Sequence, residues 1–267
     1  GMRIALGVEY DGSEFRGWQT QPGGGTVQDS LETALTQIAG VPIGVVCAGR
    51  TDAGVHAIGQ VVHFDAPVVR PLTAWVRGTN TFLSPAVAVR WAQPVSDDFH
   101  ARFSATARHY RYLLLNRPQR PGIEHGRMGW YHRPLNIERM QQAAAQIVGE
   151  HDFSAFRAAE CQAKTPVRTI YAAQVRQCGE LFIFDFEANA FLQHMVRNLV
   201  GSLVFIGQGK QSTDWMLELL ATKNRRLAAP TFAADGLYLV GVRYDARWGI
   251  PGMKGSMAGM MPAWIGA

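Results

Sequence analysis

Lysine and cysteine are both scarce in this 267-residue chain. Only four of its 26 basic residues are lysine, which leaves 22 arginines. The three cysteines (Cys47, Cys161 and Cys178) are odd in number and form no CxxC pair, which argues against a disulfide framework or a zinc ribbon. A reducing compartment, the cytoplasm, therefore fits best.

Long apolar runs and nucleotide-binding fingerprints are also absent. The longest strongly apolar stretch, 199–206, is far too short to span a bilayer. The N-terminus has no basic region followed by an apolar run, so we expect no secretory signal. The sequence has no P-loop, dinucleotide-binding glycine pattern or cluster with metal-ligand spacing. We therefore expect a protein with no membrane association, no cofactor and no metal.

The charge of the chain points to an anionic partner. Its formal net charge is +5 and its isoelectric point is near 9.3. Arginine presents a planar fork that binds phosphate and stacks on bases, whereas lysine acts as a point charge. A GC-rich genome would also enrich arginine. The distribution of the arginines along the chain has to decide between these two explanations.

Hydrophobic periodicity predicts two rounds of strand, helix and strands. The expected strands lie at 3–10, 43–49, 59–65, 85–92, 108–116, 169–177, 180–188 and 236–244. The expected helices lie at 26–40 with Thr26 as the cap, at 136–149 with Asn136 as the cap, at about 190–207, and near 214–223.

This rhythm indicates an α+β fold of two similar halves. We expect mainly antiparallel strands joined in a central sheet, with the helices on one face. The N-terminal half would span 1–106 and the C-terminal half 107–245. The remainder, 246–267, is rich in Gly, Met and Pro, and we expect it to be a flexible tail.

Residues 101–133 concentrate the basic charge. Seven arginines stand there against one acid, Glu124. Aromatic residues are interleaved with them, as in proteins that follow a phosphate backbone and stack unpaired bases. We predict RNA contacts from Arg102, Arg108 and Arg111, the alternative being a solvated arginine face over a tyrosine-lined core. The period of two places His109 and Arg111 on one strand face, with Tyr110 and Tyr112 on the other.

The segment "GRTDAGVHA", 49–57, is open to three interpretations. An aspartate between glycines is most often a turn former that bonds its own backbone. A metal site would use Asp52, His56 and His63, but their spacing matches no familiar site. The third interpretation is a lone nucleophilic or basic carboxylate at Asp52 beside an arginine.

The expected helix after "EANAF" bears on that choice. Apolar residues cover most of its circumference, and a narrow stripe is formed by His194, Arg197, Asn198 and Gly201. A buried arginine needs a partner, and Asp52 is a candidate whose pKa such a pair would lower. Arg197 capping carbonyls or pairing with another acid is the alternative.

Four sequence motifs, which follow one another in this order along the chain, are similar to those of a known family. "CAGRTDAGVHAIGQVVHF", "DDFHARFSATARHYRYLLLN", "NAFLQHMVRNLVGSL" and "AADGLYLVGVRY" resemble the tRNA pseudouridine synthase A family, and the similarity covers roughly 3–245. The family fold is two α+β halves that meet at a central sheet, with the active site in the cleft between them. His109 stands where a second basic residue is common, and the tail matches nothing.

The resemblance implies a role for each motif residue. Asp52 would be the catalytic nucleophile, Arg197 would pair with it, Arg50 would help hold the flipped-out nucleotide, and Tyr110 would stack on the target uracil. It also implies a homodimer that isomerises uridines 38, 39 and 40 in the anticodon stem-loop of tRNA, without a cofactor. The alternatives are a non-catalytic RNA-binding protein and, remotely, a metal-dependent hydrolase.

Overall fold

The structure, a computed structural model, describes residues 1–251, so the predicted flexible tail, 246–267, lies outside the described part from residue 252 onward. For its first residues the prediction is wrong: Ala246–Trp248 form a 3-10 turn, and Trp248 and Ile250 pack against a core cluster of the first unit. The chain divides into two units. The first contains 1–108 and the chain from Tyr238 onward, and the second contains His109–Leu237. Ten strands and five α-helices occur in the described residues, which confirms the predicted α+β class. Among these helices, none is long and apolar enough to cross a membrane.

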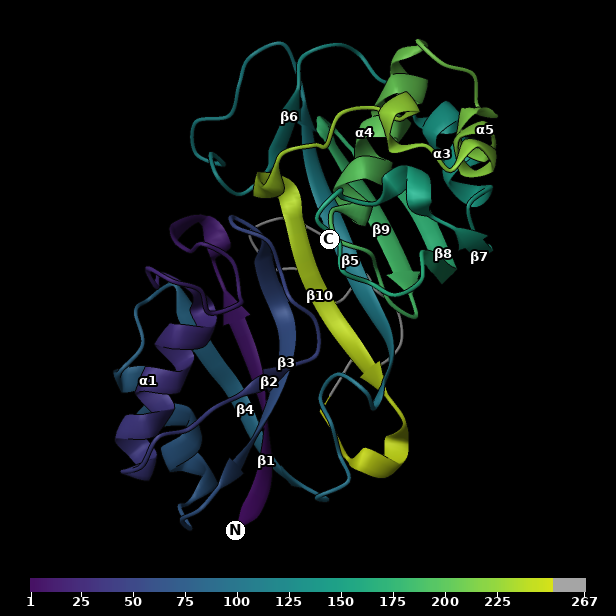
Figure 1. Ribbon diagram of the computed structural model, residues 1–267. Helices are drawn as coiled ribbons and strands as arrows, with labels where there is room; N and C mark the ends of the chain where they lie inside the picture. Colours follow the sequence, from purple (N-terminus) through teal and green to yellow (C-terminus); the bar gives the residue numbers. More distant parts are fainter. Residues whose placement is uncertain (252–267) are drawn as a thin grey trace. The chain divides into compact units, whose positions relative to one another are not determined.

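The first unit is built on a sheet with the strand order β4-β1-β3-β10, to which β2 adds by pairing with β3 (Figure 1). All pairs are antiparallel except β3 with β10, which are parallel. The sequence places β10 at the end of the second half, whereas in the structure its residues from Tyr238 belong to the first unit. The strands are β1 (Met2–Tyr10), β2 (Val46–Cys47), β3 (His56–Ala66), β4 (Val87–Val95) and β10 (Leu237–Tyr244).

Helix α1 (Val27–Ala39) follows the predicted signals. The Thr26 side chain accepts a hydrogen bond from Asp29 N, and Gly40 ends the helix in the left-handed conformation. A π-helical turn (Ala74–Gly78) and α2 (Thr79–Thr81), neither of which was predicted, complete the helical layer. The Trp75 ring packs edge-on against Phe64 of β3 at 5.0 Å between centroids, which joins this layer to the sheet.

The second unit has its own strand order, β5-β9-β8-β7, with β6 paired in parallel to β5. The hairpin of β8 and β9 turns at Gly179, as predicted, with a φ of 60°. Two short strands, β6 and β7, were not predicted. The strands are β5 (Ala105–Asn116), β6 (Gly129–Tyr131), β7 (Gly149–Asp152), β8 (Val167–Cys178) and β9 (Leu181–Ala188).

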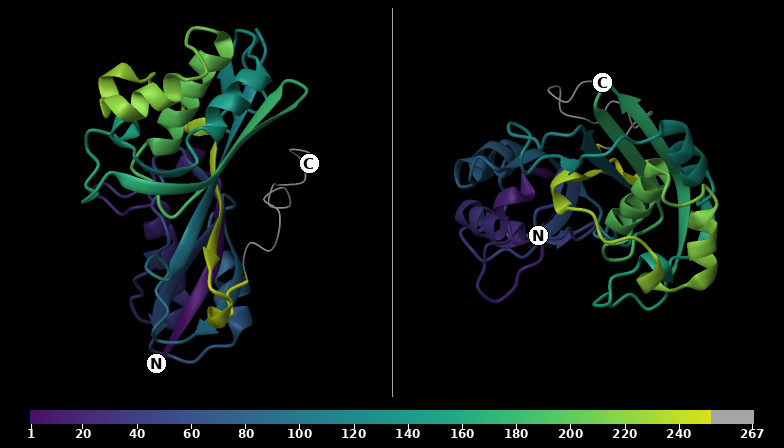
Figure 2. Two further views of the ribbon diagram at one scale, coloured as in Figure 1. Left: turned by 90° about the vertical axis from the view of Figure 1, so that its right-hand side faces the viewer. Right: turned by 90° about the horizontal axis from the view of Figure 1, so that it is seen from above.

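Three helices form a layer in this unit, as expected for helices that share one face (Figures 1 and 2). Helix α3 (Ile137–Ala145) packs on β8 and against α4 (Met195–Gln208), and α5 (Trp215–Thr222) packs against both helices. Asn136 caps α3 as predicted, but α3 ends at Ala145 with Gln146 as its C-cap, whereas Gly149, the expected end, opens β7 with a φ of 111°. Helix α4 begins five residues later than predicted, because His194 holds a φ of 64°.

Candidate functional site: the Asp52 loop and the motif residues of each unit

Asp52 lies in the loop that connects β2 to β3, as predicted. The loop closes with a turn in which Val55 N donates to Asp52 O at 3.0 Å, and Gly54 adopts a φ of 83°. Thr51, the preceding residue, is buried; its hydroxyl lies 2.7 Å from Tyr10 Oη and its carbonyl accepts a hydrogen bond from Trp18 N. The backbone on both sides of Asp52 is therefore held by hydrogen bonds.

The segment after β1 approaches this loop so closely that it requires glycine. A Cβ on Gly12 would lie 1.9 Å from Val55 O, which no side chain permits. A Cβ on Gly17 would lie 3.0 Å from Thr51 O, and Gly17 also has a φ of 89°. Two backbones thus pack face to face beneath Asp52, which makes a rigid support for its side chain.

The two charged side chains of the loop differ in exposure. Asp52 is half-buried and Arg50 is exposed. A half-buried carboxylate on a fixed backbone, with a cation two residues away, can act as a nucleophile or a base toward a bound substrate. Of the three interpretations of the segment, this geometry fits the lone carboxylate, although Asp52 also forms the backbone turn of the first interpretation.

The metal interpretation of the same loop finds no support among residues 1–251. His56 Nδ1 accepts a hydrogen bond from Gly12 N at 2.9 Å and lies 3.3 Å from Asp11 Oδ1. His63 Nδ1 accepts one from Ala101 N at 2.9 Å. In each of these two histidines Nδ1 therefore accepts a backbone hydrogen bond. The described part of the chain has no group of three His, Cys, Asp or Glu side chains that could hold a metal ion.

Arg197 lies in the first turn of α4, in the second unit, and is half-buried. Its Nε donates to Phe232 O at 2.8 Å, and Phe232 N donates back to Arg197 O. Two more residues of the predicted stripe face the same segment: Asn198 Oδ1 accepts from Thr231 Oγ1 at 2.6 Å, and a Cβ on Gly201 would lie 2.4 Å from Pro230 O. These residues hold the 230–232 segment, and the bond to Phe232 O is the carbonyl contact that the sequence left open as the alternative for Arg197. The pairing of Arg197 with Asp52 stays a prediction.

Tyr110 lies on β5, also in the second unit, and only 8% of its surface is exposed. Its ring meets that of Phe191 edge-on, with 5.0 Å between centroids. Phe191 precedes the "HMVRN" motif and was not singled out from the sequence. An aromatic contact of this kind fixes the plane of the tyrosine ring, and the stacking of Tyr110 on a uracil stays a prediction.

The alternation predicted for "RHYRY" is present, but its charged face points into the protein. His109 and Arg111 are both 0% exposed, and both bond Asp185 on β9, at 2.8 Å from His109 Nε2 and 2.6 Å from Arg111 Nε. The expectation that Arg111 contacts RNA is corrected by this finding, because its guanidinium is inside the fold. An acid between two phenylalanines in the apolar run "LFIFDF" was the available signal for Asp185.

The other two predicted RNA contacts differ from each other. Arg102 is exposed, and its guanidinium lies 5.5 Å from the centroid of the Phe103 ring. Arg108 is half-buried, and its Nη2 donates to Ala48 O at 3.0 Å and to Arg102 O at 2.9 Å. Arg108 therefore ties the turn at 100–104 to the end of β2, while Arg102 remains open to a ligand.

Each unit thus carries some of the predicted site residues, on elements whose contacts hold them in place. The structure places Arg50 and Asp52 in one loop of the first unit, and Tyr110 and Arg197 in the second unit. The sequence did not indicate which residues support these side chains, and Tyr10 is the main one. Tyr10 sits at the end of β1 and its burial was predictable from the strand pattern, but its partner Thr51 is 41 residues away.

Comparison with known proteins identifies the class. The family model described as tRNA pseudouridine synthase matches residues 7–104 and 143–245. The chain belongs to the tRNA pseudouridine synthase family. It is 68% identical to tRNA pseudouridine synthase A of Dechloromonas aromatica over 250 residues, which cover 94% of this chain and 95% of that protein. It is also 58% identical to the protein of the same name from Nitrosomonas eutropha, over 94% of this chain and 90% of that protein.

Proposed function

We propose that this chain converts uridine to pseudouridine in the anticodon arm of tRNA, at positions 38, 39 and 40, without a cofactor. The single observation that carries the proposal is the similarity to relatives named tRNA pseudouridine synthase A, at 53–68% identity over nearly the whole chain. The motif residues Arg50, Asp52, Tyr110 and Arg197 are all present.

The reaction is an isomerisation, so atoms balance within the nucleotide. The bond between N1 of uracil and C1′ of the ribose breaks, the base turns, and C1′ bonds to C5 instead. The hydrogen on C5 is lost as a proton, and N1 gains one. Nothing is oxidised or added, so the enzyme has to bind the nucleotide, labilise one bond and hold the freed base.

Asp52 is the group that we assign to the bond-breaking step. As the ionised carboxylate it adds to the sugar or the base, or removes a sugar proton. The support for its position is the fixed backbone of the loop, held by Thr51 and by the glycines at 12 and 17. We assign Arg197 as its ion-pair partner, which keeps the carboxylate ionised and aligned.

The target nucleotide has to leave the base stack before Asp52 reaches it. Base flipping costs a few kcal/mol, which contacts to the extruded nucleotide offset. We assign Tyr110 to hold the uracil and Arg50, which is exposed, to brace the RNA where the nucleotide left. We propose also that the chain acts as a cytoplasmic homodimer. A non-catalytic RNA-binding protein, the second candidate, has no observation in its favour.

The test is direct analysis of the product. Unmodified tRNA transcript is incubated with the purified protein, digested to nucleosides and separated by chromatography. We expect pseudouridine to appear as uridine decreases by the same amount, and sequencing to place it at positions 38 to 40. Binding of tRNA with no pseudouridine would refute the proposal.

A further inference from the structure

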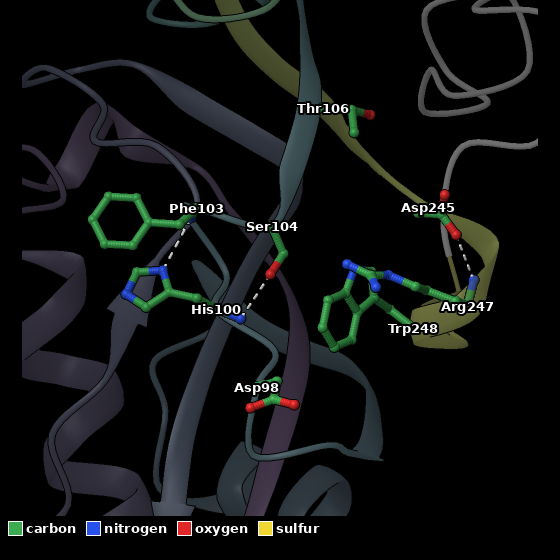
Figure 3. A pocket seen from close by; sticks show the side chains of 8 residues that line it. All are labelled: Asp98, His100, Phe103, Ser104, Thr106, Asp245, Arg247 and Trp248. Carbon is green, nitrogen blue, oxygen red and sulfur yellow. Dashed lines mark hydrogen bonds between the residues drawn. The ribbon is translucent and has the colours of Figure 1, made fainter.

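A groove in the first unit has not been assigned any role. It has a volume of about 750 Å³, within the range of pockets that bind small ligands. None of its lining residues belongs to the 49–57 loop (Figure 3). Its lining comes from the turn before β5, the start of β5 and the chain after β10, and consists of Asp98, His100, Phe103, Ser104, Thr106, Asp245, Arg247 and Trp248.

One side of the groove is an exposed aromatic stack. The Phe103 ring is 76% exposed and stacks on His100, with 4.2 Å between centroids and 20° between planes. His100 is fixed in turn, because its Nδ1 accepts hydrogen bonds from Phe103 N and Arg102 N. A phenylalanine ring that is open to water and held on a fixed histidine can stack on a ligand.

Arg247 and Trp248 line the groove from the chain after β10 (Figure 3). The Arg247 guanidinium lies 4.4 Å from the centroid of the Trp248 ring. Trp248 is anchored by Phe99, whose ring it meets at 5.6 Å, in a core cluster of the first unit. On this side an aromatic ring and an exposed guanidinium both line the groove. On the first side the exposed Arg102 does not itself line the groove, but its guanidinium lies 5.5 Å from the centroid of the Phe103 ring.

These groups match the parts of a nucleotide. Aromatic rings stack on bases of any identity, and arginines beside them contact the phosphates. Within residues 1–251, neither Arg102 nor Arg247 forms a salt bridge, so both charges are available to phosphate. Asp98 and Asp245 are exposed at the rim and can accept hydrogen bonds from the amino group of a base.

We propose that this groove binds an unpaired nucleotide of the tRNA substrate other than the target uridine, with its base stacked on Phe103 and its phosphates held by Arg102 and Arg247. The inference rests on the proposed function. It is supported by the contacts of Arg108, which bonds both Arg102 O and Ala48 O, one residue before the 49–57 loop. Arg108 thus links the turn that carries Phe103 to the residue before the 49–57 loop.

The experiment measures tRNA affinity and chemistry separately. The variant Phe103→Ala removes the stacking platform, and Phe82→Ala, which removes another exposed phenylalanine of the same unit outside the groove, is the control. We expect the dissociation constant of Phe103→Ala for full-length tRNA to rise about 5- to 150-fold, the equivalent of about 1–3 kcal/mol for one stacked base. The single-turnover rate at saturating tRNA should stay within twofold of the parent, and Phe82→Ala should match the parent in both.

Two further variants complete the test. Phe103→Trp keeps a platform and should retain the parent affinity, which separates stacking from a general disturbance of the turn. Arg247→Ala should weaken binding and reduce the slope of log affinity against log salt by about one. Unchanged affinity of Phe103→Ala overturns the proposal, and so does a loss of affinity that Phe103→Trp shares.

The outcome also separates this inference from the proposed function. If the parent protein forms pseudouridine and Phe103→Ala binds tRNA normally, only the groove assignment fails. If the parent forms none while Phe103→Ala alone loses affinity for tRNA, the groove binds RNA and the proposed function fails.

Discussion

Thr51 Oγ1 and Tyr10 Oη lie 2.7 Å apart, and both side chains are buried. This hydrogen bond joins the end of β1 to the residue before Asp52. Gln60 extends the contact, because its Nε2 donates to Gly49 O at 2.7 Å, at the start of the same loop. The loop that carries the candidate nucleophile is therefore held by side chains from β1 and β3 as well as by its own turn.

The variant Thr51→Val removes this hydrogen bond while keeping the shape of the side chain. We expect a loss of about 1–3 kcal/mol in the free energy of unfolding, because Tyr10 Oη loses a buried partner. We also expect kcat to fall about ten- to hundredfold with little change in KM, because Asp52 shifts relative to the bound nucleotide. Steady-state kinetics and urea unfolding measure the two effects. Thr73→Val, at an exposed threonine of the same unit, should alter neither, and a parent-like kcat for Thr51→Val would contradict the assigned role of the loop.

Arg197 is predicted to serve catalysis more than binding. In Arg197→Ala we expect the single-turnover rate to fall by at least about a hundredfold, the scale of losing one charge-stabilising contact, while tRNA affinity changes by less than about threefold. Arg226→Ala, at an exposed arginine of the same unit, is the control and should leave the rate intact. Filter binding and rapid-quench assays measure the two quantities. An unchanged rate in Arg197→Ala would refute the proposed pair with Asp52.

Asp185 is predicted to stabilise the fold beneath Tyr110. Burial alone would raise the pKa of Asp185, but hydrogen bonds from His109 and Arg111 hold that pKa below its ordinary value. The stability that this carboxylate contributes is therefore present above pH 3.8 and is lost as the pH falls through its lowered pKa. We expect Asp185→Asn to cost about 3–5 kcal/mol, because Arg111 remains charged and buried.

The exposed pair of Arg3 and Asp65 provides the control for Asp185. Asp65→Asn should cost less than about 1 kcal/mol, since water screens the pair. Guanidinium unfolding of both variants measures the difference. Equal losses in the two would show that the buried network adds nothing particular to the second unit.

His63 predicts a pH dependence in the first unit. Burial lowers the pKa of His63 to about 4 from 6.5, and the charges of Arg3 and His100 act in the same direction. Between pH 6.5 and 4 the unfolded chain therefore binds the proton and the folded chain does not, so stability falls as the pH falls through this window, by up to about 3 kcal/mol.

The variant His63→Asn isolates this effect. Its amide oxygen can accept the hydrogen bond from Ala101 N, and it does not titrate. We expect the decrease in Tm between pH 6.5 and 4 to become smaller in His63→Asn and to stay as in the parent in His125→Asn, an exposed control. An identical decrease in all three proteins would contradict the assignment.

Local signals in the sequence predicted most of the elements and none of their long-range contacts. Thr26 and Gly40 marked the ends of α1 correctly, because a cap and a left-handed glycine act within one helix turn. The start of α4 was missed, because the conformation of His194 has no local sequence signature. Alternation placed His109 and Arg111 on one face, but their direction depended on Asp185, which is 74 residues from Arg111.

The same contrast between local signals and long-range contacts holds for the candidate site. The Asp52 loop was correctly placed between two strands because its motif is contiguous, and the catalytic role of Asp52 stays a prediction. Tyr10, Gly12 and Gly17, which support that loop, were not predicted, because their importance arises only when two distant backbones approach each other.

The most direct measurement of the central claim is tritium release from tRNA labelled at C5 of uridine. Forming the new carbon–carbon bond displaces the hydrogen at C5, so tritium release reports isomerisation. Binding of tRNA without isomerisation releases no tritium. We expect release by the parent protein, and none by Asp52→Ala or Asp52→Asn, both of which should still bind tRNA. Release by either variant at the parent rate, or by none of the three proteins, would contradict the assignment of Asp52 as the catalytic residue of a tRNA uridine isomerase.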